Sequence, residues 1–118
     1  MKVLLFLSLI FCSLVSFAQS GGNKNESGKI LVDNDKVKVV EFVASPKANV
    51  CGRGMHFHEP HLTVALTDAK VLITTPDGKK QEAQIPANAA LWFDAGTHTA
   101  INTGDAETKL LLVYLKEQ

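Results

Sequence analysis

Three of the four histidines of this chain lie within seven residues, in the segment 55–61 with the sequence MHFHEPH. The fourth, His98, lies well downstream in DAGTHTAIN. Side chains alternate along a β-strand, so we expect His56 and His58 to point to the same face. Two neighbouring imidazoles are typical ligands of a transition-metal ion. The segment therefore predicts a metal site.

His61 has the opposite parity, and an unbroken strand would turn its side chain to the other face. Pro60 has no N–H to donate to a β-ladder, which favours a break in the strand. A bulge at Glu59-Pro60 would return His61 to the side of His56 and His58. A second interpretation stays open, because a histidine on a strand is often only a hydrogen-bonded core or surface residue, and a histidine-rich loop can bind metal loosely.

The elements that must position these histidines are short β-type segments divided by turn residues. In residues 37–45 the side chains alternate between two faces, and residues 61–67 and 70–75 are rich in β-branched side chains. The sequence TPDGKK predicts a hairpin turn, since Pro76 fixes φ and Gly78 accepts a positive φ. No sustained helical period occurs, so the pattern predicts an all-β sandwich or barrel.

The first 18 residues have the features of a secretory signal peptide. Lys2 is followed by an apolar run, and small residues precede a predicted cut between Ala18 and Gln19. We therefore expect an exported protein, periplasmic or secreted. Residues 19–28 are polar and rich in Gly and Asn, which predicts a flexible lead-in, and residues 29–118 are expected to form one domain.

Charge and cysteine content narrow the function classes. Loss of Lys2 from the 12 basic residues leaves 11, against 12 acidic residues. This near-balance of charge does not indicate a basic surface that would bind nucleic acid or an anionic membrane. Cys12 leaves with the signal peptide, so Cys51 is the one thiol of the mature chain and no intrachain disulfide is expected. We interpret Cys51 as a small half-buried hydrophobe. A redox, intermolecular or metal-adjacent role is the alternative, because Cys51 lies five residues before His56.

The two histidine segments together resemble the two motifs of the cupin superfamily. His56 and His58 are matched to the HxH of the first motif, and Gly96, His98 and Asn102 to the glycine, histidine and asparagine of the second. The resemblance covers essentially the whole mature domain. It implies a cupin-type β-barrel, the double-stranded β-helix or jelly roll, with a metal ion inside, and it implies a homodimer.

The first motif departs from the family's pattern at its glutamate ligand, because the expected position falls on Leu62 or Thr63. A count that allows one residue fewer aligns His61 with this glutamate. The resemblance thus implies a site of three or four histidines: His56, His58, His98 and, as the substitute, His61. Imidazole ligands favour iron, zinc, nickel or copper over magnesium and calcium, and the identity of the metal stays open.

Strand parity also predicts what surrounds the site. A pocket for a small-molecule ligand is expected to be lined by small inward side chains, namely Thr63, Ala65, Ala100 and Asn102. Asn102 has two interpretations, one that it orients a ligand and one that it makes hydrogen bonds within a turn. The outward row is apolar and favours packing against a second subunit; it consists of Leu62, Val64 and Leu66.

The remaining side chains near the histidines have simpler interpretations. Met55 and Phe57 are expected to face away from the metal and fill the core, and Trp92 is also expected in the core. Arg53 and Glu59 are interpreted as solvated loop charges. Two functions follow as hypotheses. One is a metal-dependent enzyme, an oxygenase or isomerase acting on a small organic molecule, and the other is a non-catalytic cupin of the cell envelope that binds metal or a small ligand.

Overall fold

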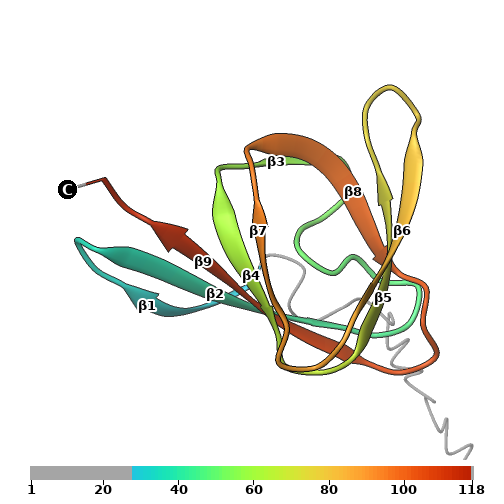
Figure 1. The fold of residues 1–118 in the computed structure, drawn as a ribbon, viewed down its shortest axis with the longest axis horizontal. Helices are drawn as coiled ribbons and strands as arrows, with labels where there is room; N and C mark the ends of the chain where they lie inside the picture. The colour runs from blue at the N-terminus through green and yellow to red at the C-terminus, as the bar shows by residue number, and fades with distance from the viewer. Residues whose placement is uncertain (1–27, 118) are drawn as a thin grey trace, which may run out of the picture.

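The structure is a computed structural model that describes residues 28–117. These residues form two antiparallel β-sheets that face each other in a barrel (Figure 1), which confirms the predicted all-β jelly-roll class. The predicted signal peptide, residues 1–18, and residues 19–27 of the lead-in lie outside the described residues. Within residues 28–117, no helix has the length and apolar character that crossing a membrane requires.

The larger sheet has five strands in the order β1-β2-β9-β4-β7. Its strands are β1 (Lys29–Asp33), β2 (Val37–Ala44), β4 (His61–Ala65), β7 (Ala90–Phe93) and β9 (Thr108–Leu115). The smaller sheet has four strands in the order β3-β8-β5-β6. Its strands are β3 (His56–His58), β5 (Ala69–Thr74), β6 (Lys80–Ile85) and β8 (Gly96–Asn102).

The core lies between the two sheets and follows the alternation of the strands. On β2 the buried side chains are those of Val40, Phe42 and Ala44, the face that the sequence pattern separated from the other. The whole core cluster consists of Val40, Phe42, Ala44, Val50, Cys51, Ala65, Ala69, Val71, Ile85, Ala100, Leu110 and Leu112. Close packing of these apolar side chains holds in place the strands that carry the histidines.

The break predicted at Glu59-Pro60 is present, and it is a corner between the two sheets. β3 ends at His58 in the smaller sheet, and β4 begins at His61 in the larger sheet. Pro60 suits this corner because it has no N–H to contribute to either ladder. The predicted hairpin after β5 is also present, with Gly78 at φ 84°.

Three predicted core residues are wrong. Met55 is 48% exposed, Phe57 is 59% exposed and Trp92 is 53% exposed. On β3 the histidines take the inner face, so Phe57 between them must point outward, where nothing in the described chain covers it. Trp92 likewise lies on the outer face of the edge strand β7.

The connection between β2 and β3 folds back against β8 (Figure 1). The Lys47 N–H donates to the Asn102 carbonyl at 2.7 Å, and the Val50 N–H donates to the Ala100 carbonyl at 3.0 Å. These bonds continue the pairing along the β3 edge of β8 past the end of β3, and Val50 and Cys51 are buried in the barrel. The homodimer implied by the apolar outward row stays a prediction.

Candidate metal centre

The antiparallel pairing of β3 with β8 brings the two histidine segments together. His56 lies directly opposite His98 in this ladder, and His58 lies opposite Gly96. The second cupin motif has two residues between its glycine and its histidine, whereas one residue lies between Gly96 and His98. The predicted match of Gly96 to the motif glycine is therefore wrong. The register nevertheless places His98 beside His56, because the strand pairing determines which side chains meet.

The ligand atoms of four side chains converge at this point. The Nε2 atoms of His56 and His58 are 2.7 Å apart, and the Sγ atom of Cys51 lies 3.5 Å from the Nε2 atoms of both His56 and His98. One ligand atom from each of the four residues lies within 4.8 Å of all the others. Three imidazoles and one thiol make a donor set that suits a transition-metal ion better than a hard cation.

The ring of His56 is held in one orientation by the loop before it. Its Nδ1–H donates to the Gly54 carbonyl at 2.8 Å, so the neutral ring keeps a lone pair on Nε2, toward the cluster. Gly52 lets the loop pass close to this ring, since a Cβ at Gly52 would lie 3.2 Å from three of its atoms. Gly52 also has φ +142°, a backbone conformation that side-chain-bearing residues rarely adopt.

His58 is buried and has a second polar partner in Tyr114 on β9. The Nδ1 atom of His58 lies 2.7 Å from the Tyr114 hydroxyl oxygen. Burial, and then the nearness of the other three histidines, lowers the pKa of His58 to about 4, so the ring is neutral at pH 7. Burial lowers the pKa of His98 as well. Neutral imidazoles are the form that binds a metal ion.

His61 faces the same interior but lies outside the four-residue group. Its Nδ1–H donates to the Glu59 carbonyl at 2.8 Å, and its ring stacks on Phe93 with centroids 5.6 Å apart. The ring centroid of His61 is 5.0 Å from that of His58. The structure therefore brings together His56, His58 and His98, and it places His61 beside them as a buried neighbour with a lowered pKa.

The interior next to the histidines is nearly full. A cavity of about 40 Å³ borders His61, His98, Thr63 and Ala100, whereas Ala65 is fully buried and does not line it. The small inward side chains leave little space because larger ones from both sheets fill it, namely Val71, Ile73, Ile85, Leu110 and Leu112. A space of this size holds about one water molecule.

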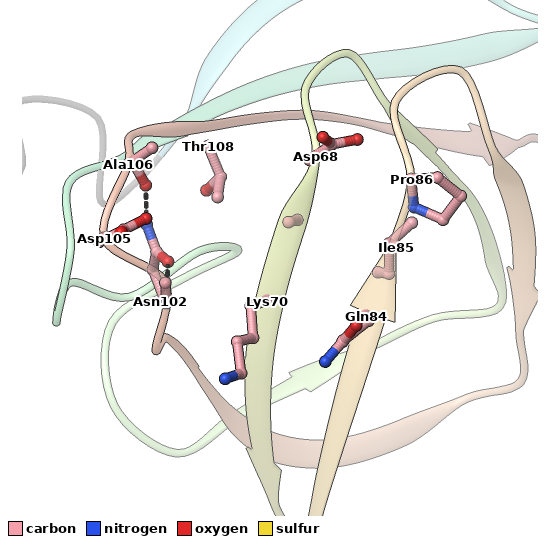
Figure 2. Close-up of a pocket in the computed structure, with 11 residues that line it drawn as sticks. Asp68, Lys70, Gln84, Ile85, Pro86, Asn102, Asp105, Ala106 and Thr108 are labelled. Atoms are coloured by element: carbon pink, nitrogen blue, oxygen red, sulfur yellow. Dashed lines mark hydrogen bonds between the residues drawn. The ribbon is translucent and has the colours of Figure 1, made fainter.

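Asn102 lies at the far end of β8, about 13 Å from His98 along the strand at the usual rise per residue. It is fully buried, and its amide nitrogen donates to the carbonyls of Ala44 and Ala106. Its amide oxygen accepts from the Gly104 N–H. Figure 2 shows Asn102 at the edge of a separate pocket of about 610 Å³. These bonds fit the turn interpretation of Asn102.

Sequence reasoning underrated two residues at the centre. Cys51 was assigned mainly to packing, and its position five residues before His56 was the available signal. Tyr114 carried no signal beyond its inward parity with Leu110 and Leu112 on the last strand. Arg53 and Glu59 have exposed side chains, in accord with their interpretation as loop charges.

The sequence and fold of this chain are similar to those of known proteins. The chain is 34% identical over 88 residues to the β-alanine degradation protein BauB of Pseudomonas aeruginosa, which covers 74% of this chain and 90% of that protein. A cupin domain of Bordetella pertussis superposes with a TM-score of 0.68 at 26% identity, covering 76% of this chain and 92% of that domain. The chain belongs to the cupin superfamily. No protein-family model matches it.

A second cupin structure agrees in fold. An RmlC-like cupin of Methanocaldococcus jannaschii with a double-stranded β-helix fold superposes with a TM-score of 0.59 at 11% identity, covering 75% of this chain and 78% of that one. At this identity the likeness shows the fold alone. Within the cupin barrel, the histidine cluster lies on β3 and β8, and the donors present suit a transition-metal ion.

Proposed function

We propose that this cupin binds one transition-metal ion through His56, His58 and His98. The observation that carries the proposal is the convergence of their ligand atoms, together with that of Cys51, within 4.8 Å. Two of these rings have their second nitrogen engaged, His56 with the Gly54 carbonyl and His58 with the Tyr114 hydroxyl. Such outer partners orient the ring, so that the other nitrogen faces the ion.

A bound ion would supply Lewis acidity, or redox activity if it is iron or copper. The residues of the chain hold the three imidazoles in position and surround them with apolar side chains. β3 and β8 are hydrogen-bonded neighbours, and they fix the spacing of the three imidazoles. The surrounding core residues limit water to about one molecule in the adjoining cavity.

A catalytic role, as a metal-dependent oxygenase or isomerase of a small organic molecule, is the second candidate. The name of the Pseudomonas aeruginosa relative assigns that protein to β-alanine degradation, and this supports a small substrate for the present chain. An outer groove of about 740 Å³ that borders His58 and Tyr114 offers space that the interior does not. Non-catalytic metal binding is favoured by the small interior cavity.

Elemental analysis of the untagged protein tests the proposal. We expect about one equivalent of metal per chain, either as purified or after reconstitution with Fe(II), Zn(II), Ni(II) or Cu(II) in turn. Oxygen consumption and product formation with small amino acids and carboxylic acids then separate the catalytic from the non-catalytic candidate. Failure to retain any of these ions after desalting would contradict metal binding altogether.

Tyr114→Phe provides a finer test of how His58 is held. The substitution keeps the ring that packs on His58 and His61 but removes the hydroxyl 2.7 Å from His58 Nδ1. Because loss of such an outer partner typically weakens metal binding tenfold to hundredfold, we expect a loss of about this size. Competition with a chromophoric chelator measures it. Unchanged affinity in a folded variant would show that the hydroxyl does not orient the ligand.

A further inference from the structure

We propose that the thiolate of Cys51 is the fourth ligand, which makes the centre a closed site of one sulfur and three nitrogens. This inference rests on the proposed function, since it concerns the same ion. It is nevertheless a separate statement, because three histidines alone would leave coordination positions open. The histidine that sequence reasoning offered as the fourth ligand, His61, then stays outside the coordination sphere.

The position of the sulfur carries the inference. Cys51 Sγ lies 3.5 Å from His56 Nε2 and 3.5 Å from His98 Nε2. For an ion with metal–sulfur bonds of about 2.3 Å and metal–nitrogen bonds of about 2.0–2.1 Å, tetrahedral angles place sulfur and nitrogen about 3.5 Å apart. The sulfur thus already lies at the separation that a shared tetrahedral ion requires from two of its three partners, whereas the Nε2 atoms of His56 and His58, now 2.7 Å apart, would separate to about 3.3 Å around such an ion.

The backbone brings Cys51 to this place by specific contacts. The Val50 N–H donates to the Ala100 carbonyl on β8, two residues beyond His98. Asn49 forms a bridge with Ile101 on the same strand. After Cys51, Gly52 allows the chain to pass close against the His56 ring. The loop is therefore fastened to the strand that carries His98, and Cys51 points into the barrel beside it.

Charge also fits a thiolate at this point. The first cupin motif supplies one carboxylate to the metal, and this chain has no acidic residue at that position. None of the acidic residues of the described part joins the ligand group. A thiolate would restore one negative charge beside the ion. The Cys51 side chain is 8% exposed, and its Sγ atom lies 3.5 Å from the Nε2 atoms of His56 and His98.

The binding step is an exchange of a proton for a metal ion. The S–H bond of Cys51 breaks, the proton goes to solvent, and a sulfur–metal bond forms with no change in oxidation state. Burial raises the pKa of the Cys51 thiol to about 12 in the metal-free protein, and a coordinated cation deprotonates a thiol outright. A soft sulfur donor also favours zinc or copper(I) over iron with oxygen ligands.

Cobalt(II) substitution tests the inference, because cobalt bound to a thiolate shows an intense charge-transfer absorption in the near ultraviolet. The full chain is loaded with cobalt and compared with Cys51→Ser. Cys12→Ser is the matched control, since it removes the other cysteine, which lies outside the described residues. We expect the band in the parent chain and in Cys12→Ser, and its loss in Cys51→Ser. At saturation, Cys51→Ser should still bind about one equivalent of cobalt, but with an affinity at least about tenfold weaker than that of the parent chain.

Thiol reactivity gives a second readout. Zinc should slow modification of Cys51 by a disulfide reagent at least about tenfold in the Cys12→Ser chain. A parent chain that binds cobalt without the charge-transfer band, or a zinc-loaded chain whose thiol reacts at the metal-free rate, would overturn sulfur ligation and leave the histidine site intact. A parent chain that binds no cobalt would instead contradict the proposed function. The cobalt absorption spectrum of the parent chain still tests sulfur ligation if Cys51→Ser does not fold.

Discussion

Saturation with its metal should raise the melting temperature of this cupin, and His56→Ala should abolish that rise. An ion at 100 times its dissociation constant stabilises the folded state by about 2.7 kcal/mol. For a domain of this size, that corresponds to an upward shift of roughly 10–20 °C. Removal of His56 deletes one of the converging ligand atoms, and we expect metal affinity to fall more than about a hundredfold, beyond the usual loss from an outer partner.

The metal-free stability of His56→Ala should change little by comparison. The His56 ring is partly exposed, and it lies at the end of the short strand β3 instead of in the core cluster. Phe57→Ala is the matched control, because Phe57 is the next residue of the same three-residue strand and points outward with 59% exposure. Differential scanning fluorimetry with and without metal measures both variants. An equal metal-dependent shift in His56→Ala and Phe57→Ala would rule out His56 as a ligand.

Strand parity and turn chemistry allowed much of this centre to be predicted from the sequence. The HxH spacing placed His56 and His58 on one face, and Pro60 indicated where the ladder must break. Both predictions depend on local geometry, which two or three neighbouring residues determine. The likeness of both segments to the cupin motifs supplied the long-range step, that His98 joins His56 and His58 at one site. Their pairing across a β3–β8 ladder was not predicted and comes from the structure.

The parts that the sequence did not predict depend on contacts between distant segments. Cys51 reaches the histidines only because its loop folds back along β8 through backbone hydrogen bonds, which leave no pattern in side-chain types. Tyr114 meets His58 across 56 positions of sequence. Phe57 and Trp92 were expected in the core because of their apolar character, but burial depends on which face another element covers.

Asn102→Ala should lower the free energy of unfolding by about 3 kcal/mol and leave metal binding unchanged. The Asn102 side chain is fully buried and joins three backbone groups, the carbonyls of Ala44 and Ala106 and the N–H of Gly104. Truncation leaves these groups without that partner, at a cost of about 1–3 kcal/mol for each one that water cannot reach. Urea denaturation measures the loss, which corresponds to a melting temperature lower by roughly 15 °C.

This prediction also decides between the two interpretations of Asn102. A residue that oriented a ligand at the metal would change metal or ligand affinity when truncated, whereas a residue that fastens the turn after β8 changes stability alone. Gln84→Ala is the control, since Gln84 borders the same pocket in Figure 2 and its side chain is exposed. Unfolding free energies within about 0.5 kcal/mol of each other in the two variants would contradict the structural role. An Asn102→Ala variant that keeps its stability but binds metal more weakly would support the interpretation that Asn102 orients a ligand.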